Sequence, residues 1–173
     1  SDPGSFWLHE DICVHPSERT IVNNLVQFGQ KLKVIEAFVQ QNGSQPRTCS
    51  GTAPHIPSVY LVRMCDGLAE VLGTYRRAVA KLDHELELNP VLPVVYFQAQ
   101  LADLLEVLHE LADLCSHIMR NHLRAAPLLN ELHRRSQSGI PHVRGVILRL
   151  LRYSYDLMVQ HIMFWMVHGV LPK

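Results

Sequence analysis

Residues 139–169 read GIPHVRGVILRLLRYSYDLMVQHIMFWMVHG, and this stretch decides the fold class. A Gly-x-Pro turn at residues 139–141 opens a helical pattern that becomes more apolar until it ends in a Trp-x-x-x-Gly sequence at Gly169. A helix that is apolar on most of its circumference needs cover on most of its circumference. Few residues follow Gly169, so we expect the chain to be part of a larger protein whose next segment supplies that cover.

Helical periodicity of the apolar residues extends from this stretch over the rest of the chain, without strand-like alternation beyond chance. Breaks at Pro, Gly, Ser and Asn divide the pattern into about five helices. The expected helices are residues 15–42, 58–89, 93–122, 127–136 and 141–169. Apolar spacings of three and four residues favour shallow crossing angles between such helices. We therefore predict an all-α fold, an elongated antiparallel bundle of about five helices.

The three long helices before residue 139 each carry an apolar seam that predicts the core. In the first helix the seam is Ile21, Leu25, Phe28, Leu32, Ile35 and Val39. In the second it is Leu61, Met64, Cys65, Leu68, Val71, Leu72, Tyr75, Val79, Leu82 and Leu86. In the third it is Leu101, Leu104, Leu105, Leu108, Leu111, Cys115 and Ile118, with His122 added at its end. These seams predict one core shared by the long helices.

Length and composition limit the class of protein. A chain of 173 residues suffices for one sizeable domain with a core, and 47% hydrophobic with 18% charged residues is typical of a folded protein. The formal net charge is zero, whereas nucleic-acid binders usually carry an excess of basic residues. No stretch reaches roughly 18 uncharged apolar residues. We therefore expect a partner that is neither nucleic acid nor membrane.

The chain reads as one domain with short additions. Residues 1–5 are interpreted as a candidate expression remnant, and residues 6–171 as a helical-bundle domain within a longer protein. Residues 42–57 are rich in Gly, Ser and Pro and predict a flexible loop. The four cysteines, Cys13, Cys49, Cys65 and Cys115, lack a C-x-x-C pair, and this spacing is typical of reduced cysteines in a cytosolic protein.

One cluster of residues could hold a metal ion. His109, Asp113 and His117 are spaced four residues apart and fall on one helix face, where histidine and carboxylate can share a zinc ion. A solvated face with weak pairs between successive turns explains the same spacing. The sequence contains no G-x-S-x-G, Gly-rich phosphate loop or H-E-x-x-H motif. We therefore expect no enzyme, no cofactor and no resident metal.

A basic stripe with neighbouring tyrosines is the candidate partner-binding site. Positive charge gathers around the fourth helix and the start of the fifth at Arg134, Arg135, Arg144, Arg149 and Arg152. Tyr153 and Tyr155 flank the stripe, and tyrosine beside arginine is typical of interface hot spots. Trp165 belongs to the apolar end of the same helix. The predicted contact residues are Arg144, Arg149, Arg152, Tyr153, Tyr155 and Trp165.

Four segments of the chain, taken together, resemble the gamma-tubulin complex protein family. They are His15-Pro16-Ser17-Glu18; Val59 to Leu68 with Val71, Leu72, Tyr75 and Arg76; Ser138 to Arg144; and Trp165 to Leu171. The segments are colinear and span nearly the whole chain, from about Phe6 to Leu171.

The resemblance implies the N-terminal helical-bundle domain of a gamma-tubulin complex protein. In that family the domain packs side by side with neighbouring complex proteins in the gamma-tubulin ring, which nucleates microtubules. The C-terminal domain of the family grips gamma-tubulin, so the resemblance implies only indirect contact with gamma-tubulin here. It also implies a place in the cytoplasm, at the cytoskeleton and the microtubule organising centre (centrosome and spindle), and no catalytic residues.

Two other functions remain open from the residues themselves. An adaptor that captures a helical peptide in a groove beside the fifth helix would need the same exposed apolar surface as a lateral scaffold. A helical bundle with a metal site at His109, Asp113 and His117 belongs to a different class of protein.

Overall fold

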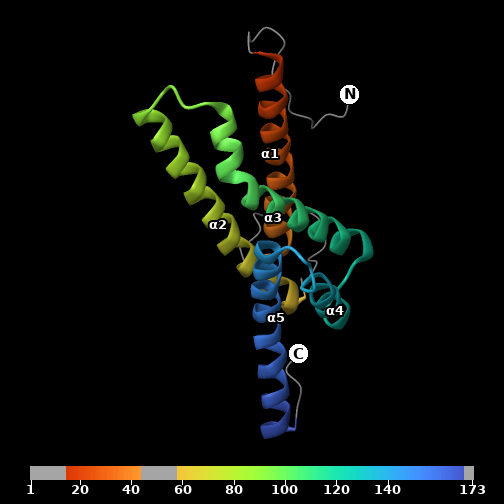
Figure 1. Cartoon of the computed structure of the whole chain (residues 1–173). Coiled ribbons are helices and arrows are strands. Elements are labelled where there is room, and N and C mark those ends of the chain that lie inside the picture. Colours follow the sequence, from red (N-terminus) through yellow and green to blue (C-terminus); the bar gives the residue numbers. More distant parts are fainter. Residues whose placement is uncertain (1–14, 44–57, 170–173) are drawn as a thin grey trace, which may run out of the picture.

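A computed structural model describes residues 15–43 and 58–169, and both ranges are built from α-helices without a strand. The helices are α1 (Pro16–Asn42), α2 (Val59–Leu88), α3 (Val94–Asn121), α4 (Ala126–Arg135) and α5 (Pro141–His168) (Figure 1). The prediction of an all-α bundle of about five helices is confirmed. The predictions for residues 1–5 and for most of the 42–57 loop lie outside the described residues.

The helix ends follow the residues that predicted them. Proline occupies the first turn of α1, α4 and α5, where its missing N–H removes no helical hydrogen bond. At the far end of α5, Gly169 has φ 67° and donates its N–H to the carbonyl of Trp165. That left-handed conformation suits glycine because it has no Cβ. His122 ends α3 with φ 50°, and its side chain is exposed, so the inward orientation predicted for it is wrong.

A single core lies where the second halves of α1 and α3 meet the first halves of α2 and α5. Met64, Leu68, Leu114 and Leu150 are fully buried there, together with α4 side chains such as Leu128. Burying side chains of this size stabilises the fold by about 1.5–3 kcal/mol each. Met64 and Leu68 belong to the seam predicted for the second helix, whereas Leu114 lies outside the seam predicted for the third helix.

Two parts of the predicted seams differ from the structure. In α1 the fully buried residues are Ile35 and Phe38, whereas Val39 is only partly buried. The helix therefore presents a slightly rotated face to the core. In α2 the seam loses its cover towards the C-terminal end, since Val79 and Leu86 are exposed. The reason is that this end of α2 lies away from α4 and α5 (Figure 1).

Helices α2 and α5 pack closely and run antiparallel. Residues early in α2 meet residues late in α5, as the contact between the rings of Tyr60 and His161 shows. Farther along, Gly67 faces Leu150 and Tyr153, and a Cβ at Gly67 would lie 2.8 Å from Leu150 Cδ2. Glycine at this position therefore permits the close approach of the two helices.

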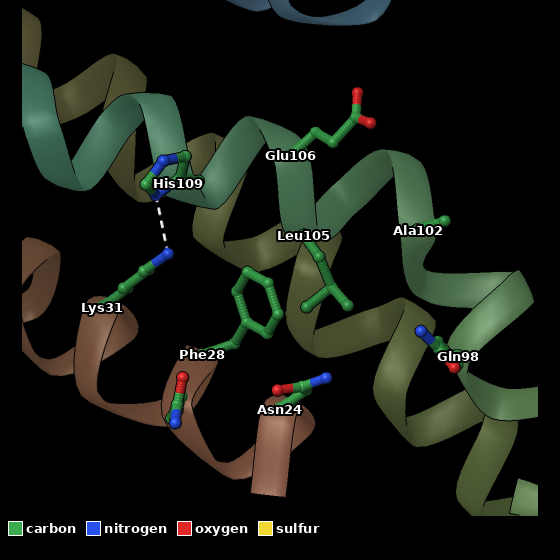
Figure 2. Close-up of a pocket in the computed structure, with 9 residues that line it drawn as sticks. Asn24, Phe28, Lys31, Gln98, Ala102, Leu105, Glu106 and His109 are labelled. Carbon is green, nitrogen blue, oxygen red and sulfur yellow. Dashed lines mark hydrogen bonds between the residues drawn. The ribbon is translucent and has the colours of Figure 1, made fainter. Parts of the chain in front are cut away.

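The second half of α5 extends beyond the other helices (Figure 1). Its last buried residue is Leu157, and from Ile162 to Gly169 every residue is exposed. Helices α1 and α3 meet on the other side of the core, where they run past each other in the same direction (Figure 2). Within residues 15–43 and 58–169, no helix is long and apolar enough to cross a lipid bilayer.

Candidate functional site

The predicted basic stripe divides into engaged and exposed arginines. Arg149 donates to Glu70 on α2 at 3.3 Å, and the hydroxyl of Tyr153 donates to the same carboxylate at 2.8 Å. This hydrogen bond raises the pKa of Tyr153 above its usual value, because the carboxylate stabilises the protonated phenol. The side chains of Arg144 and Arg152 are exposed and form no hydrogen bond or ion pair with another described residue. Arg149 and Tyr153 therefore join α5 to α2, and the other two arginines face solvent.

The two remaining predicted contact residues lie in different surroundings. Tyr155 is partly buried and packs against the hydrophobic core. Trp165 lies in the extended end of α5 and is 53% exposed. An indole ring with that exposure buries far less apolar surface than it could against a partner.

The extended end of α5 is the largest uncovered apolar feature among the described residues. Six consecutive residues are exposed between 43% and 74%: Ile162, Met163, Phe164, Trp165, Met166 and Val167. They surround the helix because consecutive residues point about 100° apart. Contiguous apolar surface of this kind marks sites of protein–protein contact.

The arginines of α4 are neutralised within the fold. Glu131 accepts from the guanidinium groups of Arg134 at 2.6 Å and Arg135 at 2.8 Å, and Arg135 also reaches Glu110 on α3. These bonds, led by that of Arg134, lower the pKa of Glu131 to about 2 against the opposing effect of burial. Arg135 therefore joins α4 to α3, whereas Arg134 pairs with Glu131 within α4.

The candidate metal residues are not gathered around one point. His109 Nδ1 lies 2.6 Å from Nζ of Lys31, so one of its two possible metal-binding nitrogens is occupied. His109 and Asp113 are 3.9 Å apart, whereas His117 bonds to Asn121 and approaches Glu131. Among residues 15–43 and 58–169, no three His, Cys, Asp or Glu side chains are arranged to hold a metal ion.

The cysteines within the described ranges lack the features of nucleophiles. Cys65 and Cys115 are free thiols buried in the core. Burial raises the pKa of Cys65 to about 12 and that of Cys115 further, because the thiolate would be desolvated. Cys13 and Cys49 lie outside the described residues.

A groove lies between α1 and α3, and the seams did not predict it. It has a volume of about 390 Å³, with Phe28, Ala102 and Leu105 forming its apolar floor. In Figure 2 the ring of Phe28 lies beneath Leu105, and Lys31 and His109 close one end. Glu106 lines the rim and also bonds to His142 at the start of α5 at 2.7 Å. Sequence spacing also did not identify Glu70 and Glu131 as the partners of the arginines, because neither residue belongs to an apolar pattern.

The fold and these surfaces define an all-α domain whose most prominent described surface is an uncovered apolar helix. Comparison with known proteins agrees with the segments that carried the family resemblance. The family described as Gamma tubulin complex component N-terminal matches residues 5–173. The chain therefore belongs to the gamma-tubulin complex component N-terminal family.

Several relatives are similar over nearly the whole chain. Gamma-tubulin complex component 4 of Arabidopsis thaliana is 29% identical over 99% of this chain, and a homolog in Medicago truncatula is 28% identical over the same share. Gamma-tubulin complex component 4 of Mus musculus is 25% identical over 91%. The resemblance to the gamma-tubulin complex protein family is thereby confirmed, and these relatives are all component 4 proteins. The chain spans only about a quarter of the length of these relatives, from 24% to 25%.

Proposed function

We propose that this chain is a non-catalytic scaffold domain of a gamma-tubulin complex, where it associates laterally with other gamma-tubulin complex proteins. In this role it supports microtubule nucleation at the microtubule organising centre and reaches gamma-tubulin only indirectly. The membership of the chain in this family supports its assignment to a gamma-tubulin complex. The observation that carries the lateral contact is the exposed apolar end of α5.

The binding surface combines the two exposed parts of α5. Arg144 and Arg152 supply positive charge on the first half, and Trp165 with its apolar neighbours supplies the surface on the second. Exposed charge orients an approaching partner, whereas desolvated aromatic and apolar side chains provide most of the affinity. Arg149, Tyr153 and Tyr155 contribute by holding this helix on the core.

A pull-down from cytosolic extract tests the proposal. The chain is the bait, and gamma-tubulin complex proteins are identified by mass spectrometry. We expect their recovery, and we expect Met163→Glu with Met166→Glu to reduce it about tenfold or more, because charged groups would be desolvated on binding.

The matched control is Leu88→Glu with Val91→Glu at the α2–α3 turn, where both residues are exposed but lie far from α5 (Figure 1). This control should recover the same proteins as the unmodified chain. Recovery of one helical protein outside the gamma-tubulin complex would instead favour the peptide-binding adaptor. If no gamma-tubulin complex protein is recovered, lateral association by this chain is wrong.

A further inference from the structure

The first half of α1 carries apolar side chains that the other described helices cover only in part. Ile21, Leu25 and Phe28 belong to the seam predicted for this helix, yet each is only partly buried. No side chain of α1 between Pro16 and Val34 is buried. Further cover of this apolar surface would therefore stabilise the fold.

The groove between α1 and α3 is the concave part of this surface. Phe28, Ala102 and Leu105 form its apolar floor, and its volume is about 390 Å³. The amides of Asn24 and Gln98 lie at the end nearest the start of α1 (Figure 2). A volume of this size accommodates an indole ring, and amides at the rim can donate hydrogen bonds to a carboxylate.

The charged groups of the groove favour an aromatic occupant. Nζ of Lys31 lies 4.8 Å from the centroid of the Phe28 ring, and a cation in this position also attracts the face of a second aromatic ring. Glu106 points away from the groove and bonds to His142 at 2.7 Å (Figure 2). The carboxylate of Glu106 therefore does not oppose an acidic group in the groove.

The chain before α1 contains side chains of matching chemistry. Phe6, Trp7 and Leu8 are consecutive large apolar residues, and the acids Glu10 and Asp11 follow them closely. Residues 6–11 lie outside the described residues. Their attachment to the start of α1 raises their concentration at the groove to the order of millimolar, which favours them over a separate partner.

The connection to α1 is long enough to reach the groove. Trp7 stands eight residues before His15, and eight residues span up to about 26 Å. Phe28 stands thirteen residues after His15, which is about 20 Å along the helix. The difference of about 6 Å leaves two residues for the chain to reverse its direction.

The same placement brings the acidic end of the segment to the amide end of the groove. With Trp7 over Phe28, Glu10 comes up to about 10 Å nearer the start of α1. Asn24 precedes Phe28 by four residues, and Gln98 precedes Ala102 by four, so both amides lie about 6 Å from the apolar floor in that direction. The remaining distance is within the reach of the side chains.

We propose that residues 6–11 bind in the groove between α1 and α3 of the same molecule, with the indole ring of Trp7 on Phe28 and Ala102. The aromatic contact provides most of the affinity, because an indole ring buries a large apolar area. The amides of Asn24 and Gln98 donate to Glu10. The bound segment joins α1 to α3 and covers the exposed part of the α1 seam.

The inference goes beyond the proposed function and does not rest on it. It concerns α1 and α3, whereas the lateral contact is assigned to α5. The pull-down and the test of this inference can therefore fail independently.

Fluorescence of the full chain tests the inference, because Trp7 and Trp165 are its two tryptophans. Trp165→Phe leaves Trp7 as the single reporter, and Trp165 lies in the exposed end of α5, away from the groove. We expect Trp7 to emit at shorter wavelength in the full chain than in a synthetic peptide of residues 1–14. Acrylamide should also quench it less in the full chain than in the peptide.

Two further substitutions in the Trp165→Phe chain locate the binding site. Ala102→Glu should lower the ratio of bound to free segment about tenfold, because a carboxylate would be desolvated beneath the indole ring. The emission and quenching of Trp7 should then approach those of the peptide. Ala80→Glu on the exposed side of α2 is the matched control and should change neither. Circular dichroism checks that both variants remain helical.

The position of Glu10 is tested by changing the charge of Gln98, whose side chain is exposed. Gln98→Lys should strengthen the shielding of Trp7, and Gln98→Glu should weaken it. Equal effects of the two substitutions would contradict the placement of Glu10.

Three results would overturn the inference. In the first, Trp7 of the full chain is quenched as strongly as in the peptide. In the second, Trp7 is shielded but Ala102→Glu has no more effect than Ala80→Glu, which places the segment elsewhere. In the third, the shielding disappears on dilution of the chain, which assigns the groove to the segment of a second copy.

Discussion

The two halves of α5 are both rich in apolar residues but lie in opposite environments. In the first half Val143, Ile147 and Leu150 are buried against α2 and α4. In the second half six consecutive apolar residues are exposed. The comparison shows that apolar periodicity identifies the residues that are suited to burial. Whether they are buried within the chain depends on which other helices pack against them.

The largest expected effect comes from truncating the covered half. Leu150→Ala should lower the free energy of unfolding by about 2–5 kcal/mol, because Leu150 is fully buried and its neighbours cannot fill the space completely. Urea unfolding followed by circular dichroism measures the change. A loss below about 0.5 kcal/mol would show that α5 does not pack on α2 as described.

A smaller effect is expected from the ion pairs of Glu131 with Arg134 and Arg135 within α4, the short helix that packs on α5. Glu131→Gln should destabilise the fold by roughly 1–3 kcal/mol at pH 7, discounted because Arg134 is well exposed to water. The folded pKa of Glu131, about 2, lies below its ordinary value of 4.5. Its stabilisation is therefore present above about pH 4.5 and is lost as the pH falls towards 2.

Unfolding free energies of both proteins across this pH range check the sign. The difference between the unmodified chain and Glu131→Gln should shrink as the pH falls. A difference that stays constant between pH 7 and pH 2.5 would contradict the assigned ion pairs.

Alanine substitutions at two glycines of α2 test how closely α2 and the covered half of α5 approach each other. Gly67→Ala should cost about 1 kcal/mol, since the close contact with Leu150 and Tyr153 outweighs the better helix propensity of alanine. Gly73→Ala is the matched control, because a Cβ there meets nothing within 4 Å. It should stabilise the protein by up to about 1 kcal/mol. Equal melting shifts for the two variants would contradict the close approach at Gly67.

The smallest effect on stability should come from the uncovered half. Trp165→Ala should change the free energy of unfolding by less than about 0.5 kcal/mol, because the side chain has little contact within the described fold. The same variant should weaken recovery of gamma-tubulin complex proteins in the pull-down. Destabilisation as large as that of Leu150→Ala would show that Trp165 is buried within the isolated chain.

The helix boundaries could be predicted because they depend on local chemistry. Pro16, Gly43, Pro90 and Gly139 each stand at or beside a helix end, where a missing N–H or a free backbone conformation is tolerated. Periodicity likewise predicted part of the core of α3, such as Leu108 and Leu111, although it did not include Leu114. Local rules of this kind require no knowledge of the neighbouring helix.

The candidate site could be predicted only in part. Sequence spacing placed Arg149 and Arg152 in one stripe, but Glu70 lies 79 residues from Arg149 and engages only that arginine. The groove at Phe28 depends on how α1 and α3 approach each other, and Phe28 and Leu105 had been assigned to the core. Both the ion pair of Arg149 and the groove depend on contacts between residues far apart in the sequence. Periodicity within one helix contains no information about such contacts.

Hydrogen exchange along α5 tests the central claim most directly, in the free chain and in the complex captured from extract. In the free chain we expect slow exchange for amides up to about Leu157 and fast exchange from Ile162 to His168, because the second half lacks tertiary cover. In the complex the second half should become protected while the first half changes little. Unchanged exchange from Ile162 to His168 in a complex that contains gamma-tubulin complex proteins would contradict the assignment of this helix as their binding surface.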